Sequence, residues 1–194
     1  ASVNMLSQSK KRVLNLTKKD YSLKTLTSII NSINNSKKLF KQIRLKFTII
    51  DHNSDEKIIK KMKKLLKWQF FKSEIIKLDI ELYKKKIKKI NQEGKKVTTN
   101  QISNMSNINQ SLHLGKDCDD LVYFVEDDYI HAANAIEEMI YTYERISSQT
   151  GKELILCPSD YPYLYNKLEN SNIFLGHKHH WLSLIHISEP TRLS

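Results

Sequence analysis

Four stretches of the chain carry apolar residues at the spacing of three and four positions that gives a helix one buried face. Asp20 or Ser22 can cap the first stretch, and Ser54 or Asp55 can cap the second. Gly115 follows the third stretch as an expected C-terminal cap. The predicted helices and their apolar positions are 23–33 (Leu23, Leu26, Ile29, Ile30, Ile33), 58–66 (Ile58, Ile59, Met62, Leu65, Leu66), 98–114 (Ile102, Met105, Ile108, Leu112) and 128–146 (Ile136, Met139, Ile140, Tyr143).

Short runs rich in β-branched and other apolar residues lie between these helices and predict strands. The run at 121–125, LVYFV, has the strongest strand composition, and Pro158 ends the last run. Strands that alternate with helices are typical of an α/β domain with a mostly parallel sheet flanked by helices. The predicted strands are 12–17, 45–50, 74–79, 121–125 and 154–157.

The positive charge of the chain is concentrated in one segment. The whole chain of 194 residues has a formal net charge of +11, and residues 56–96 hold 15 Lys against five acidic residues. These lysines alternate with Ile and Leu at helical spacing, which favours solvated helix faces. The near absence of Arg makes nucleic acid an unexpected partner. A peripheral contact with an anionic membrane stays open, as does the alternative of a basic, non-enzymatic module that binds nucleic acid or membrane through 56–96.

Three consecutive carboxylates, Glu126, Asp127 and Asp128, follow the predicted strand 121–125. The carboxyl ends of strands are where open α/β sheets bind ligands. Adjacent anions repel one another unless a cation neutralises them, and their oxygen ligands suit Mg²⁺ or Mn²⁺. Strict alternation along a strand would place Glu126 and Asp128 on the same face. The simpler alternative is that Asp127 or Asp128 caps the helix that follows.

The order of motifs resembles that of nucleotide-sugar glycosyltransferases of the GT-A fold, family 2 type. The matching segments are TKKDYSLKTLTSII at 17–30, IIDHNSD at 49–55, NMSNINQSL at 104–112 and FVEDDY at 124–129. The resemblance covers about residues 11–146 and implies a Rossmann-like GT-A sheet. It also implies transfer of a sugar from a nucleoside-diphosphate sugar to a saccharide or lipid-linked acceptor. The absence of a Gly-rich loop near the first predicted strand argues against a nucleotidyltransferase.

The resemblance also assigns roles to individual residues. Asp51 would accept hydrogen bonds from the base or ribose of the donor, and Thr17 and Asn107 would line the nucleotide cleft. Glu126 and Asp127 would lie near the nucleotide sugar, and Asp128 with Glu126 would hold the metal. Two positions depart from the family pattern: the acidic motif begins with Glu126, which is one methylene longer than Asp, and His52 stands where a second acid often follows Asp51.

The C-terminal third of the chain offers fewer assignments. Asp160 is the one candidate for a catalytic base, and the aromatic segment 159–165 is either an acceptor-sugar platform or a loop packed on the sheet. His177, His179 and His180 in GHKHHW are either metal ligands or surface histidines. Residues 182–192, LSLIHISEPTR, resemble the translation of a sequencing-library adapter.

We therefore expect a partial glycosyltransferase domain at 1–181, an artefactual tail at 182–194, and a natural chain that continues past Trp181 with its catalytic base there. Two cysteines and no apolar run of membrane-spanning length favour the cytoplasm, with the inner membrane face as a peripheral location.

Overall fold

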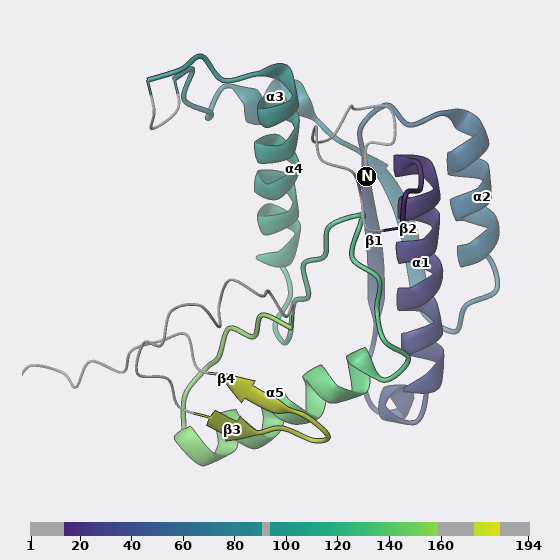
Figure 1. The fold of residues 1–194 in the computed structure, drawn as a ribbon, viewed down its shortest axis with the longest axis vertical. Helices are drawn as coiled ribbons and strands as arrows, with labels where there is room; N and C mark the ends of the chain where they lie inside the picture. The colour runs from purple at the N-terminus through teal and green to yellow at the C-terminus, as the bar shows by residue number, and fades with distance from the viewer. Residues whose placement is uncertain (1–13, 91–93, 159–172, 183–194) are drawn as a thin grey trace, which may run out of the picture. The chain divides into compact units, whose positions relative to one another are not determined.

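The computed structural model describes residues 14–90, 94–158 and 173–182 (Figure 1). The chain forms two compact units: residues 1–30 with 40–131, and residues 31–39 with 132–194. Helix and strand are mixed along it. The elements are α1 (Lys18–Asn35), the 3-10 turn η1 (Leu39–Lys41), β1 (Lys46–Asp51), α2 (Glu56–Leu66), β2 (Lys72–Lys77), α3 (Ile80–Lys84), α4 (Thr99–Gly115), α5 (Ala135–Thr150), β3 (Ile173–Leu175) and β4 (His180–Leu182).

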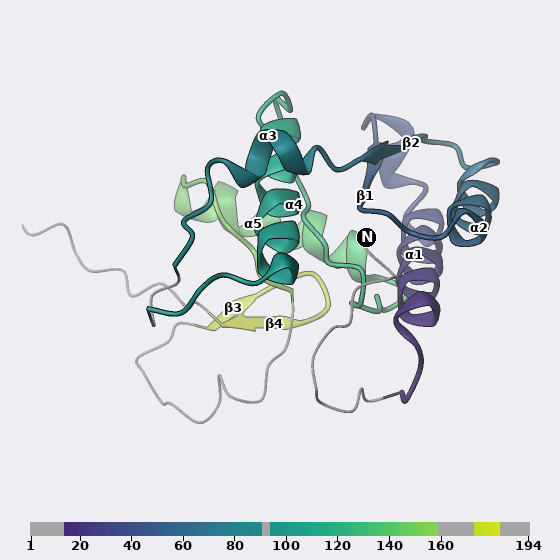
Figure 2. The same ribbon diagram turned by 90° about the horizontal axis from the view of Figure 1, so that it is seen from above.

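The first unit is built on a parallel pair of strands. β1 pairs with β2 in a register that matches Ile49 with Ile75 and Asp51 with Lys77. The connection between them is α2, which lies beside α1 in both ribbon views (Figures 1 and 2). A parallel pair needs such a crossover, so the predicted strand–helix–strand order at 45–79 is confirmed. The buried apolar side chains of this unit are Tyr21, Leu26, Ile29, Ile30, Ile50, Ile58, Met62, Leu66, Phe71, Leu78 and Tyr83.

Two predicted strands are wrong within the described residues. Residues 121–125 are not hydrogen-bonded as a strand, and each of their side chains is 38–50% exposed. Residues 154–157 are likewise outside any strand, with Ile155 93% exposed. A strand exists only where a neighbouring chain accepts and donates its backbone hydrogen bonds, and the described residues supply no such neighbour to these runs. A further strand is predicted at 12–17. Residues 12 and 13 lie outside the described residues, and 14–17 form a turn and a loop rather than a strand.

Helix α4 is where predicted, but it buries a different face. Its N-terminus has the capping box that Thr98 and Gln101 form, with Thr98 accepting from the Gln101 backbone. The expected apolar face points mostly to solvent, since Met105, Ile108 and Leu112 are 43–53% exposed. The buried residues are instead Ser103, Ser106 and Gln110. Buried polar side chains usually need polar partners. Ser103 and Gln110 find theirs at the ends of β1 and β2, whereas Ser106 Oγ has no partner in the described residues.

Gly115 is needed for a reason other than the expected left-handed cap. It is the last residue of α4, and the C-cap Lys116 is right-handed. A β-carbon on Gly115 would lie 3.0 Å from the ring of Phe124 and 3.2 Å from Val122. The glycine therefore allows segment 121–125 to approach the end of the helix closely.

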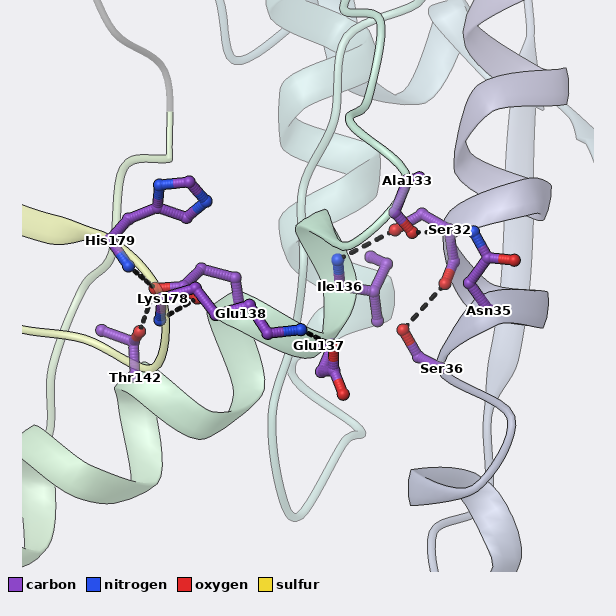
Figure 3. A network of polar contacts seen from close by, with 10 residues as sticks. All are labelled: Ser32, Asn35, Ser36, Ala133, Ile136, Glu137, Glu138, Thr142, Lys178 and His179. Atoms are coloured by element: carbon purple, nitrogen blue, oxygen red, sulfur yellow. Dashed lines mark hydrogen bonds and ion pairs between the residues drawn. The ribbon is translucent and has the colours of Figure 1, made fainter.

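The second unit contains α5 and the antiparallel hairpin of β3 and β4, in which Phe174 pairs with Trp181. α5 begins at Ala135, not at the predicted Asp128. Its N-cap Asn134 makes no side-chain capping bond. The hydroxyl of Ser32, which is fully buried, instead accepts from the Ile136 backbone at 3.0 Å (Figure 3). The start of the helix is thus set by a residue about a hundred positions earlier.

Candidate functional site

Asp51 ends β1 and is 9% exposed. Its Oδ2 accepts from the Ser54 backbone at 3.1 Å, in a turn where Asn53 has a positive φ of 55°. Its Oδ1 is buried and has no hydrogen-bond partner in the described part of the chain. A buried carboxylate oxygen without a donor costs free energy. Within the described residues Asp51 Oδ1 shares this status with three other buried side-chain atoms, Thr25 Oγ1, Ser106 Oγ and His131 Nδ1.

Side chains from α4 surround this end of the sheet. Ser103 Oγ lies 2.7 Å from His52 Nδ1, and Asn107 donates to the Ile50 carbonyl at 3.4 Å. Gln110 joins the end of β2 by accepting from the Asp79 backbone at 2.8 Å and donating to the Lys77 carbonyl at 3.2 Å. These bonds hold α4 against the carboxyl ends of both strands, and they bring Asn107 and Asp51 to the same strand end.

The acidic segment is held through its middle residue. Asp127 accepts from the Ser22 hydroxyl at 3.0 Å, and its other oxygen lies 3.6 Å from Lys18 Nζ. Glu126 and Asp128 remain exposed. Because 121–126 is not a strand, the alternation that would place Glu126 and Asp128 on one face does not apply. Asp127 is therefore the residue that anchors the segment, and the other two carboxylates are exposed on either side of it.

Electrostatics at this segment favour a cation. Partial burial raises the pKa of Glu126, and the negative charges of Asp128 and Asp127 raise it further, while Lys18 opposes them. A bound divalent cation would relieve that repulsion. The described residues contain no group of three His, Cys, Asp or Glu side chains placed to hold a metal ion. Two carboxylates are sufficient for Mg²⁺ when substrate phosphates supply further ligands. The roles of Glu126 and Asp128 as metal ligands stay predictions.

The first turn of α1 connects these two regions. Lys18 pairs with Asp127, and its neighbour Lys19 pairs with Asp55 in the turn after β1. Just before them, Thr17 donates to Asp20 at 2.6 Å. A helix N-terminus carries partial positive charge from its unpaired N–H groups, to which Lys18 and Lys19 add. Thr17, the turn after Asp51 and the acidic segment thus all adjoin the start of α1.

A second polar cluster lies in the second unit, around Glu138 of α5 (Figure 3). Glu138 is 4% exposed. Its carboxylate accepts from the backbones of Lys178 at 2.7 Å and His179 at 3.2 Å. It also accepts from the Trp181 indole at 3.2 Å and the Thr142 hydroxyl at 3.1 Å. Burial alone would raise the pKa of Glu138, but these four hydrogen bonds, that of Trp181 first, lower it below its ordinary value.

Gly176 makes this arrangement possible. A β-carbon there would lie 2.5 Å from the Thr142 hydroxyl and 2.6 Å from Glu138 and Trp181. Arg145 donates to the Gly176 carbonyl at 3.3 Å, which fixes the hairpin from a second side. The histidines of GHKHHW lie in and beside this hairpin turn, exposed, with His177 stacked on Tyr141 at 4.7 Å between ring centroids.

The sequence analysis missed Glu138, Gly176 and Ser32 as structural positions. One signal was present: Glu138, Thr142 and Ile146 are spaced by four, so Glu138 shares a stripe with a buried Ile. The predicted catalytic Asp160 and the aromatic segment 159–165 lie outside the described residues. Their roles stay predictions.

The comparisons with other proteins do not assign a family. No protein-family model, no curated protein and no solved structure matches the chain. Among the described helices, none has the length and apolar character needed to cross a membrane. The function is therefore argued from the site.

Proposed function

We propose that the chain is a metal-dependent glycosyltransferase domain of the GT-A type, which binds a nucleoside-diphosphate sugar at the carboxyl end of β1. The observation that carries the proposal is Asp51, whose buried Oδ1 has no donor among the described residues. Parallel α/β sheets bind ligands at the carboxyl ends of their strands, and β1 and β2 are parallel. A ribose hydroxyl or a base N–H would satisfy this oxygen. The larger Rossmann-like sheet of that fold is part of the proposal.

The N-terminus of α1 suits the diphosphate, because its N–H groups supply positive potential. Lys18 and Lys19 in its first turn pair with Asp127 and Asp55. Asp127 holds the acidic segment to α1, so that the exposed Glu126 and Asp128 are presented as metal ligands. A bound Mg²⁺ or Mn²⁺ would neutralise charge on the departing nucleoside diphosphate. Asp160 as base and a saccharide or lipid-linked acceptor belong to the same proposal.

Calorimetry with UDP in the presence and absence of Mn²⁺ tests the two halves of this site separately. Asp51→Asn should weaken UDP binding about tenfold or more under both conditions, because it removes an acceptor that only the ligand uses. Asp128→Ala should remove the part of the affinity that depends on Mn²⁺ and leave the rest. Asp120→Ala, an exposed acid six residues before Glu126, is the control and should bind as the wild type does.

GDP and ADP are titrated in the same way, because the base is not specified by the residues described. Failure of all three nucleotides to bind with Mn²⁺ would exclude the proposal. Equal affinity of the wild type and Asp51→Asn would exclude the role of Asp51, and equal Mn²⁺ dependence in Asp128→Ala would exclude the metal assignment.

A further inference from the structure

The outer face of α2 and the turn after it form a second surface, which the proposed site does not use. Six lysines, all exposed, lie on α2 and at its C-cap. In the described parts of the chain none of the six takes part in an ion pair. The opposite face of the helix is buried through Ile58, Met62 and Leu66, so the lysines are held on one side by the fold. They are Lys57, Lys60, Lys61, Lys63, Lys64 and Lys67. We call this set, with Trp68, the α2 surface.

Trp68 makes this surface more than a solvated helix face. It is 83% exposed, which is unusual for the largest apolar side chain. The neighbouring aromatic residues behave differently, since Phe70 packs on Phe40 at 5.8 Å and on Phe71 at 5.4 Å between ring centroids. Trp68 stays outside that cluster, with Lys67 Nζ 4.9 Å from its ring centroid. Trp68 lies four residues after Lys64, so its position continues the helical stripe of Lys57, Lys61 and Lys64.

A groove beside the helix extends the positive charge. Its lining includes Lys60, Lys63, Lys64 and Lys67, over apolar Leu66, Phe71 and Ile75. The acid in its lining, Glu74, lies 2.8 Å from Lys46 Nζ and accepts from Thr48, and these contacts lower its pKa. The negative charge of Glu74 is therefore already matched, and the net charge of the groove is positive.

We propose that the α2 surface docks on an anionic phospholipid bilayer, with Trp68 inserted at the level of the headgroups. Lysines attract the anionic leaflet while their stems lie along apolar surface, and an exposed Trp prefers the boundary between water and acyl chains. The strength of such peripheral binding rises with the apolar area inserted and with the electrostatic attraction to anionic lipids, and this surface offers both. The surface carries lysines and no arginine. Arginine is the side chain that binds phosphate and base edges through two parallel hydrogen bonds, so its absence favours a bilayer over nucleic acid as the partner.

Vesicle sedimentation with the full chain tests this surface. The probes are vesicles of phosphatidylcholine alone and of phosphatidylcholine with about 30% phosphatidylserine. The chain should bind only the anionic vesicles, and about 0.5 M salt should release it because salt screens the surface charges. Replacing Lys60, Lys64 and Lys67 by Ser should weaken binding about tenfold or more. Trp68→Ala should weaken it several-fold and abolish the blue shift of Trp fluorescence on binding.

The matched control replaces Lys85, Lys88 and Lys89 by Ser, which removes the same charge from exposed positions outside the surface. It should bind within about twofold of the wild type.

Circular dichroism of each variant shows whether it folds. Asp51→Asn should bind vesicles as the wild type does, which separates this proposal from the nucleotide site. Three results would overturn the proposal. The first is that the chain does not bind anionic vesicles at low salt, and the second is that the two triple-lysine variants lose the same vesicle affinity. The third is that the chain binds single-stranded RNA more tightly than vesicles and does so through the lysines of the α2 surface.

Discussion

Two buried carboxylates in this molecule have opposite surroundings. Glu138 in the second unit accepts hydrogen bonds from four donors, which come from α5 and from the hairpin about forty residues later. Asp51 in the first unit accepts from the Ser54 backbone through Oδ2, and its Oδ1 has no donor in the described residues. Both are at least nine-tenths buried. They differ in whether the protein itself completes their hydrogen bonding.

The difference distinguishes a buried carboxylate that stabilises the fold from one that can bind a ligand. A satisfied carboxylate such as Glu138 joins two pieces of chain, and its removal leaves several donors without a partner. A buried carboxylate that lacks a donor, such as Asp51, lowers the stability of the fold locally, and a ligand that donates to it can offset that loss of free energy. The comparison therefore predicts large stability effects at Glu138 and small ones at Asp51, with the reverse order for ligand binding.

The largest expected effect is that of Glu138→Ala on the free energy of unfolding. We expect a loss of about 3 kcal/mol, because the substitution leaves the partly buried donors of Lys178, His179 and Trp181 without the carboxylate that they share. Urea denaturation followed by Trp181 fluorescence, in a Trp68→Phe background, measures it. The control is Glu137→Ala, which breaks only a surface pair with Lys178 and should cost at most about 1 kcal/mol. Equal losses in the two variants would contradict the anchoring role.

The pH dependence of stability should differ in sign between the two units. The folded pKa of Glu138 lies below its ordinary value of 4.5, so its stabilisation is complete above pH 4.5 and is lost as pH falls through the lowered pKa. The pKa of Glu126 is raised above 4.5, so protonation on acidification relieves repulsion and adds stability between the raised pKa and 4.5. Unfolding is followed by Trp181 fluorescence for the second unit and by hydrogen exchange of the β1 and β2 backbone amides for the first.

Two substitutions isolate these contributions. Glu138→Gln should remove the loss of stability of the second unit below pH 4.5, and Glu126→Gln should remove the gain in the first. A Glu138→Gln variant that is as acid-labile as the wild type would show that other carboxylates determine the acid response.

The smallest expected effect on stability is that of Asp51→Asn. The amide oxygen can still accept from Ser54, and a buried charge is removed, so the free energy of unfolding should stay within about 1 kcal/mol of the wild type. Thermal unfolding without nucleotide measures it. Asp51→Ala, which loses the Ser54 bond as well, is the comparison and should be less stable than Asn. A loss in Asp51→Asn as large as that in Glu138→Ala would make Asp51 a structural residue.

Local pattern was sufficient for the parts of the fold that local physics controls. The apolar spacing of α1 and α2 predicts these helices closely, because the residues of each buried face lie within a few turns of one another in sequence. The strand ending at Asp51 was also predictable, and with it the place of the carboxylate. Its unsatisfied oxygen was not, since that depends on what the rest of the chain does or does not donate.

The errors share a cause. Residues 121–125 have strand composition, but a strand needs a hydrogen-bonded neighbour, and composition does not supply one. The start of α5 depends on Ser32, and the burial of polar Ser103 and Gln110 depends on the strand ends that receive them. In each case the deciding partner is distant in sequence.

The amino-acid sequence alone determined where α1, α2, α4 and the parallel strand pair form, where the positive charge gathers, and which carboxylates follow the strand runs. Periodicity and composition are local quantities, so they carry that information directly. Only the tertiary structure decided that Glu138 is fully hydrogen-bonded, that Asp51 Oδ1 has no donor among the described residues, and that Trp68 stands exposed beside the lysines of α2. Those outcomes depend on which distant backbone and side-chain groups meet, because burial and hydrogen bonding are properties of the folded chain as a whole.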